Sequence, residues 1–100
     1  MKEKGGYVYI VSNKLRTVLY VGVTSNLYGR ITDHKNGEGC YFTKKYKCSD
    51  IIYYEFFSDI EEAIKKEKQL KKWNRSWKEN LIKKMNPQLR DLYDHIENML

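Results

Sequence analysis

Two short runs near the start of the sequence, rich in β-branched and aromatic residues, restrict the fold of this chain more than any other feature. Residues 6–12 read Gly-Tyr-Val-Tyr-Ile-Val-Ser, and residues 17–23 read Thr-Val-Leu-Tyr-Val-Gly-Val. Side chains of these types favour extended backbone. Only four residues separate the runs, and a connection this short joins strands that run in opposite directions. The sequence therefore predicts an antiparallel β-hairpin.

A third strand and a first helix are predicted beyond the hairpin. A helix begins after Thr24 or Ser25, either of which could cap it, and ends near residue 35, with Gly37 as its stop. The polar, basic stretch 36–50 is predicted to be a loop. Residues 51–57, Ile-Ile-Tyr-Tyr-Glu-Phe-Phe, form the third strand.

The second half of the chain reads as three helices. Capping boxes at Ser58 with Glu61 and at Ser76 with Glu79 open the first two, and Asn86-Pro87 is predicted to begin the third. The element order is thus β-β-α-β-α-α-α. This order predicts an α+β fold, with a three-stranded antiparallel sheet flanked by helices.

Length and composition limit the functions to consider. One hundred residues suit a single domain over 1–100. The net charge of +6 points to polyanions, with nucleic acid first and an acidic membrane surface second. No apolar run approaches the roughly 20 residues of a membrane span. Two cysteines cannot build a disulfide framework, so we expect a cytoplasmic protein with reduced thiols.

Basic residues are concentrated in the helical half. Between Lys65 and Lys84 there are nine basic and two acidic residues. They form either a solvated helix face or a surface that tracks phosphates, with Trp73 and Trp77 as stacking partners. On the second reading, the residues expected to bind nucleic acid are Lys44, Lys45, Lys71, Lys72, Arg75 and Lys78.

Glu67 is the most unusual single residue. At 100° per residue it falls within the apolar stripe of the predicted helix 58–73. A carboxylate on a packing face is costly unless it is ion-paired, protonated or bound to a metal. A zinc site is a separate alternative, but its candidate ligands lack a paired Cys-x-x-Cys knuckle. Those candidates are His34, Cys40, Cys48 and His95.

Two further pairs of polar residues are spaced so that their side chains can lie together on one face of an element. Tyr7 and Tyr9 point to one face of their strand, and Arg30 and His34 lie one helical turn apart on the expected inward stripe of their helix. Each pattern also fits plain packing or a structural hydrogen bond. Taken together with Glu67, however, these residues supply a base, a phosphate-binding cation and a metal ligand. That set is the inventory for hydrolysis of a phosphodiester bond.

These residues also resemble a known family. Gly6-Tyr7-Val8-Tyr9, followed by Tyr20-Val21-Gly22, resembles the paired signature of the GIY-YIG nuclease superfamily. Arg30, His34 and Glu67 stand at the spacing of that family's functional residues. The resemblance covers about residues 5–95, and the stretch 73–93 resembles small stand-alone bacterial members that are similar to the nuclease domain of the excision-repair endonuclease subunit.

The resemblance implies a fold and a chemistry. The fold is a small three-stranded antiparallel sheet with helices, and the activity is hydrolysis of DNA phosphodiester bonds with one Mg²⁺, for which Mn²⁺ can substitute. By position, Glu67 would hold the metal, and Arg30 would contact the cleaved phosphate. Tyr9 and Tyr20 would flank the attacking water, one of them acting as general base with help from His34.

The sequence also departs from the family pattern. Val23 follows Gly22 where the repair nuclease has a lysine, and the chain has no room for the separate DNA-binding domain of the larger members. We therefore expect a structure- or damage-directed endonuclease of DNA repair or processing. The alternative is a catalytically weak or inactive nucleic-acid-binding module of the same fold. RNA as the substrate, and a protein partner that targets the chain, also stay open.

Overall fold

Three antiparallel strands form the centre of the molecule in the computed structural model, which describes residues 5–99. The strands are β1 (Gly6–Ser12), β2 (Leu19–Thr24) and β3 (Asp50–Phe57), in the spatial order β2-β1-β3. Tyr9 pairs with Gly22 on one side and with Tyr54 on the other. The predicted α+β fold and its antiparallel sheet are confirmed.

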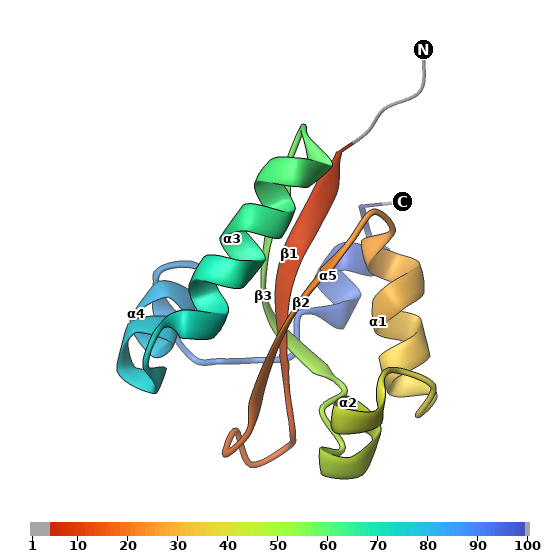
Figure 1. Cartoon of the computed structure of the whole chain (residues 1–100). Coiled ribbons are helices and arrows are strands. Elements are labelled where there is room, and N and C mark those ends of the chain that lie inside the picture. Colours follow the sequence, from red (N-terminus) through yellow and green to blue (C-terminus); the bar gives the residue numbers. More distant parts are fainter. Residues whose placement is uncertain (1–4, 100) are drawn as a thin grey trace.

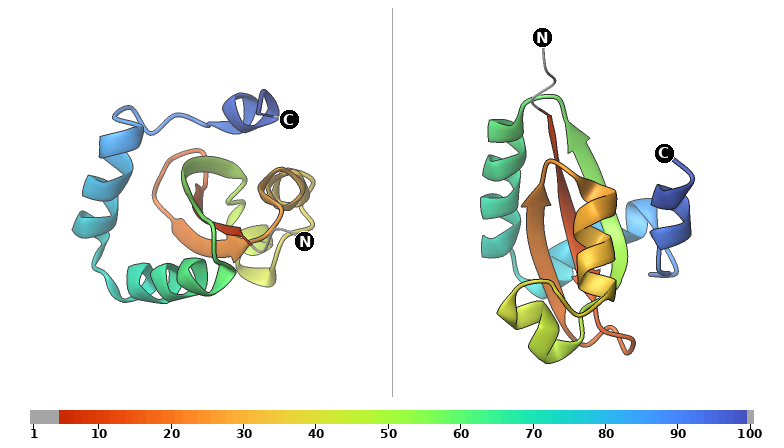
Figure 2. Two further views of the ribbon diagram at one scale, coloured as in Figure 1. Left: turned by 90° about the horizontal axis from the view of Figure 1, so that it is seen from above. Right: turned by 90° about the vertical axis from the view of Figure 1, so that its right-hand side faces the viewer.

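Helices cover both faces of this sheet, as Figure 1 and the right panel of Figure 2 show. The helices α3 (Ile60–Lys72) and α4 (Arg75–Met85) lie on one face, and α1 (Leu27–Lys35) and α5 (Tyr93–Glu97) lie on the other. The short helix α2 (Tyr41–Tyr46) lies at the lower end of the sheet in Figure 1. No helix within residues 5–99 is long and apolar enough to cross a membrane.

Strand alternation divides the buried side chains into two cores. Even-numbered β1 residues, such as Val8 and Ile10, pack with Leu70 and Ile82 of α3 and α4. Odd-numbered β1 residues, such as Tyr9, pack with α1 and α5. Because successive strand residues point to opposite faces, each face of the sheet presents its own set of side chains. Tyr7 and Tyr9 therefore share the α1 face, as predicted from their spacing.

The predicted loop 36–50 is wrong in one part, because it contains α2. This helix is only six residues long, buries only Thr43, and ends at Lys47 in the left-handed conformation (φ 57°). Such a short helix, with one buried position, produces no helical periodicity in the sequence. Its other side chains face solvent.

All four predicted helix starts are also wrong. The side chain of Asn26, and not that of Thr24 or Ser25, caps α1. The Asp59 side chain, and not Ser58, accepts the hydrogen bond that caps α3, and Asn74, and not Ser76, caps α4. Asn86 does not begin a helix. It ends α4, is buried, and its amide donates to the carbonyl oxygens of Ile52 and Arg90 at 3.1 and 2.7 Å. The chain then crosses to the other face before α5 starts at Tyr93.

Candidate active site

Tyr9 is the most buried polar side chain predicted to take part in chemistry, with an exposed fraction of 3%. Its ring packs over Gly22 of the neighbouring strand, where an added Cβ would collide with the ring carbon that carries the hydroxyl. Glycine at this position thus lets the Tyr9 ring lie across β2. Gly22, the glycine in the second half of the sequence signature, is therefore required by the packing of the Tyr9 ring.

The Tyr9 hydroxyl begins a chain of hydrogen bonds through α1 and α2. It lies 3.0 Å from His34 Nε2, and His34 Nδ1 lies 3.1 Å from Thr43 Oγ1. The Thr43 hydroxyl donates to the Cys40 carbonyl oxygen at 3.1 Å. Its oxygen is then free to accept, so Nδ1 of His34 carries the hydrogen and Nε2 accepts from Tyr9.

The environment keeps His34 in its neutral form. Burial lowers the pKa of His34 below its ordinary value of 6.5, and the Arg30 guanidinium lowers it further. A neutral imidazole with a free electron pair on Nε2 can receive a proton from Tyr9. This pair is therefore arranged for proton transfer.

The two tyrosines differ in their surroundings. Burial raises the pKa of Tyr9, and the nearby positive charge of Arg30 opposes this shift. The pKa of Tyr20 is raised to about 12, first by a hydrogen bond with the Cys40 thiol and then by burial. Of the two tyrosine hydroxyls, only that of Tyr9 is hydrogen-bonded to His34, at Nε2. The Tyr20 ring stands edge-on to the His34 ring, with centroids 6.4 Å apart.

Glu67 reaches this cluster from α3. Its side chain is 13% exposed, and Oε2 forms an ion pair with Lys71 Nζ at 2.7 Å. Lys71 Nζ also lies 5.5 Å from the centre of the Tyr20 ring. The negative charge of Glu67 raises the pKa of both tyrosines, which puts the carboxylate near both hydroxyls. A carboxylate on this helix face was expected to be ion-paired, protonated or bound to a metal, and the structure contains the ion pair.

The donor set fits a magnesium ion. Mg²⁺ binds through one or two carboxylates and completes its shell with water and substrate phosphates. A cationic ammonium group already stands beside Glu67, and half of its surface is open to solvent, so a metal ion can displace it. Residues 5–99 contain no group of three potential His, Cys, Asp or Glu ligands. The zinc alternative is therefore not supported by these residues.

Arg30 is exposed, although it was predicted to lie on the inward stripe of its helix. Leu27, Ile31 and His34 are the buried residues of α1. Arg30 lies one helical turn before His34 on α1, and its positive charge acts to lower the pKa values of Tyr9, Tyr20 and His34. An exposed guanidinium at this place can bind an incoming anion directly.

The predicted nucleic-acid-binding residues come from three helices, α2, α3 and α4. Lys44 and Lys45 are exposed on α2, Lys72 is exposed on α3, and Lys78 is half-buried on α4. Lys71 is paired with Glu67. Arg75 binds Glu79 at 2.8 Å and donates to the carbonyl oxygens of Arg16 and Thr17. Arg75 therefore joins α4 to the β1–β2 loop, which is a structural role.

Sequence reasoning missed Thr43 and Cys40 as members of the cluster. Thr43 is 3% exposed and fixes the imidazole of His34, and the Cys40 thiol shares a hydrogen bond with Tyr20. Gly39 belongs to the same arrangement, because a Cβ there would collide with His34 Nδ1. The pattern Gly-Cys-x-x-Thr just after the helix that carries Arg30 and His34 was the only signal for these contacts.

The neutral state of His34 predicts a pH dependence of stability. The unfolded chain binds a proton at His34 near pH 6.5, whereas the folded chain binds it only at a lower pH. The free energy of unfolding should therefore fall as the pH drops from about 7 to 5. Urea denaturation at several pH values measures this slope. His34→Gln should remove that part of the slope, and an unchanged slope in the variant would contradict the neutral imidazole.

The model of the GIY-YIG catalytic domain matches residues 5–80. The chain belongs to the GIY-YIG family, a family of nucleases, and this confirms the resemblance seen in the sequence. The match supports nucleic acid as the class of substrate.

Within that family, the chain is similar to small UPF0213 proteins. It is 38% identical over 76 residues to the one of Staphylococcus haemolyticus, with 76% of this chain and 92% of the relative covered. It is 41% identical over 76 residues to that of Clostridium perfringens, covering 76% and 81%. The solution NMR structure of the UPF0213 protein BH0048 from Bacillus halodurans superimposes with a TM-score of 0.55 at 28% identity, covering 84% and 88%.

Proposed function

We propose that this chain is one nuclease domain, with its core at about residues 5–95, and that it hydrolyses DNA phosphodiester bonds with a divalent metal. The observation that carries the proposal is the hydrogen-bonded chain Tyr9–His34–Thr43, which lies beside Arg30 and Glu67. A cytoplasmic role in DNA repair or processing, directed by DNA structure or damage, suits a small basic nuclease.

Tyr9 supplies the general base in this proposal. A water molecule that attacks phosphorus gives its proton to the Tyr9 oxygen as the Tyr9 proton passes to His34 Nε2. The new P–O bond forms while the bond from phosphorus to the leaving oxygen breaks. Because the raised pKa of Tyr9 disfavours a free phenolate, the relay to a neutral His34 is what makes Tyr9 effective. Thr43 holds the imidazole in the required tautomer.

Arg30 and Glu67 provide the electrostatic part. The guanidinium of Arg30 stabilises the charge that develops on the phosphate oxygens. Glu67 is the carboxylate that would hold Mg²⁺ or Mn²⁺. When bound there, such an ion acts as a Lewis acid that stabilises negative charge on the leaving side of the phosphate.

The second candidate function is a nucleic-acid-binding module without useful turnover. The ion pair between Glu67 and Lys71 favours it, because this pair gives the half-buried carboxylate a purely structural partner. Such a module would bind DNA through its net charge of +6 and would need no metal.

A cleavage assay separates the two functions. Purified protein is expected to nick supercoiled plasmid and a branched duplex with Mg²⁺ or Mn²⁺ and to stop with excess EDTA. Arg30→Ala should fold normally, because Arg30 is exposed, and should cleave about 100-fold more slowly. No cleavage by the unchanged protein, together with salt-sensitive DNA binding, would support the binding module. Equal cleavage by both proteins would indicate a contaminating nuclease.

A further inference from the structure

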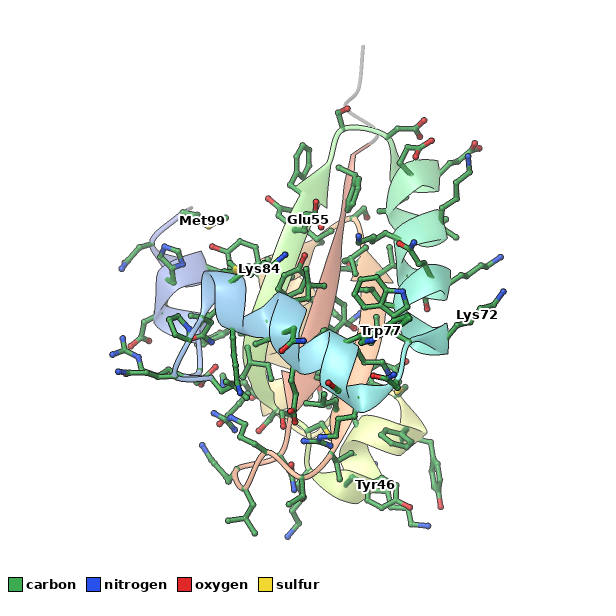
Figure 3. All side chains as sticks on the ribbon, turned by 90° about the vertical axis from the view of Figure 1, so that its left-hand side faces the viewer. Tyr46, Glu55, Lys72, Trp77, Lys84 and Met99 are labelled. Carbon is green, nitrogen blue, oxygen red and sulfur yellow. The ribbon has the colours of Figure 1, made fainter. Side chains whose placement is uncertain are left out.

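The short helix α2 exposes three aromatic rings beside the candidate active site. The exposed fractions are 77% for Tyr41, 39% for Phe42 and 42% for Tyr46. Figure 3 shows Tyr46 on the outside of α2, far from Trp77 on α4. A cluster of large apolar side chains in water marks a binding surface more often than a packing element. The rings therefore need a partner that the fold itself does not supply.

The exposed rings of α2 adjoin the ring of Tyr20, one of the candidate active-site residues. The Tyr20 and Phe42 rings are stacked, with centroids 5.6 Å apart and an interplanar angle of 29°. The Phe42 and Tyr46 centroids are 4.8 Å apart. A row of rings thus runs from Tyr20 to the outer surface of α2. A flat ligand that lies along this row is led directly to the candidate catalytic residues.

The charge around the rings is positive. Lys45 Nζ lies 5.9 Å from the centre of the Tyr41 ring and 5.4 Å from that of Tyr46. Lys44 and Lys47 are also exposed, and there is no acidic residue from 39 to 49. The fitting partner therefore combines negative charge with exposed flat rings. Single-stranded nucleic acid has this combination, whereas a duplex hides the faces of its bases.

We propose that α2 is a stacking platform for unpaired nucleotides of the DNA strand that enters the active site. The proposal rests on the nuclease function above and narrows its substrate to DNA with a single-stranded segment beside the cleaved bond, such as a flap, overhang or gap. Thr43 of the same helix holds His34, so a strand on α2 is fixed relative to the Tyr9–His34 pair.

Binding measured without cleavage tests the platform. The full chain in EDTA is titrated against a fluorescein-labelled blunt duplex and against the same duplex with a short single-stranded overhang, and fluorescence anisotropy gives both Kd values. We expect the overhang to be preferred by about fivefold or more, because one stacked base contributes at least this much. The double variant Tyr41→Ala, Tyr46→Ala should lose the preference and keep its Kd for the blunt duplex.

Two further variants keep the test decisive. Tyr41→Phe with Tyr46→Phe retains the rings and should retain the preference, which separates stacking from loss of the helix. Phe56→Ala removes an aromatic ring that is 51% exposed on β3 and should leave the overhang preference unchanged. A 2-aminopurine base in the overhang should be quenched on binding by the unchanged protein but not by the alanine double variant.

Contrary results have distinct meanings. An overhang preference that persists in the double alanine variant, or that is lost in Phe56→Ala, would overturn the platform on α2. Tighter binding of a ribonucleotide overhang than of the DNA overhang would overturn the choice of DNA. The nuclease proposal is judged separately, by cleavage of the overhang duplex and of plasmid in Mg²⁺. A preference for the overhang without cleavage of either substrate would leave the binding surface on α2 standing and refute the nuclease.

Discussion

Changing Glu67 to Gln is expected to lower metal-dependent DNA cleavage by at least about 1,000-fold, because a catalytic metal ion contributes several kcal/mol and each 1.4 kcal/mol is a factor of ten. The amide keeps the shape of the side chain but has no negative charge with which to hold Mg²⁺. The measurement is the rate of plasmid nicking at saturating DNA over a range of Mg²⁺ concentrations. Binding of DNA should persist in the variant.

Lys71→Ala is the matched control for this prediction. If Glu67 serves only as the partner of Lys71, both changes break the same partly exposed i,i+4 ion pair, and each should cost about 0.3–0.5 kcal/mol of stability. Neither would then affect cleavage. If Glu67 holds the metal, Lys71→Ala should leave nicking at saturating DNA near the unchanged rate, because it removes a competitor of the metal. Equal nicking by Glu67→Gln and the unchanged protein would refute the metal assignment.

The strands and long helices could be predicted from the sequence because their signals are local. Residues 6–12 are rich in β-branched and aromatic side chains, and β1 buries nearly all of them. The apolar stripe of α3 repeats over several turns, and the helix buries Ala63 and Leu70 of that stripe. The exact caps could not be predicted, since Ser58 and Asp59 are adjacent and both residue types accept a cap hydrogen bond. Tertiary contacts decide between such neighbours.

Asn86 shows how a tertiary contact overrides a local signal. Asn-Pro commonly begins a helix, but here the amide of Asn86 is buried against the Ile52 carbonyl of β3. That hydrogen bond spans 34 residues and has no signature in the sequence. The same limit applies to the site. Glu67 was identified from its position on an apolar helix face, and the resemblance gave the roles of Tyr9, Tyr20, Arg30 and His34. The contact of Thr43 with His34, in contrast, depends on a six-residue helix.

Tyr9→Phe is the second change with a large expected effect. It removes the oxygen that would take the proton from water, and general base catalysis contributes about 100- to 10,000-fold, so the cleavage rate should fall by about that factor. Cleavage by the unchanged protein should rise with pH through the lowered pKa of His34, because only the neutral imidazole accepts the Tyr9 proton. The residual cleavage by Tyr9→Phe should lack this rise. Nicking rates between about pH 5 and 8 measure both effects.

Tyr53→Phe and Tyr20→Phe show whether the effect belongs to Tyr9. Tyr53 is equally buried, on the opposite face of the sheet, and its hydroxyl donates to Glu55 at 2.8 Å. Removing the Tyr53 hydroxyl should lower the free energy of unfolding by about 1–3 kcal/mol, as removal of the Tyr9 hydroxyl does. It should not change how the cleavage rate depends on pH. Tyr20 bonds to Cys40 and has no bond to His34, so its loss should reduce the rate and leave the rise with pH in place. If the rise of the cleavage rate with pH is lost in Tyr20→Phe and kept in Tyr9→Phe, Tyr20 and not Tyr9 is the general base.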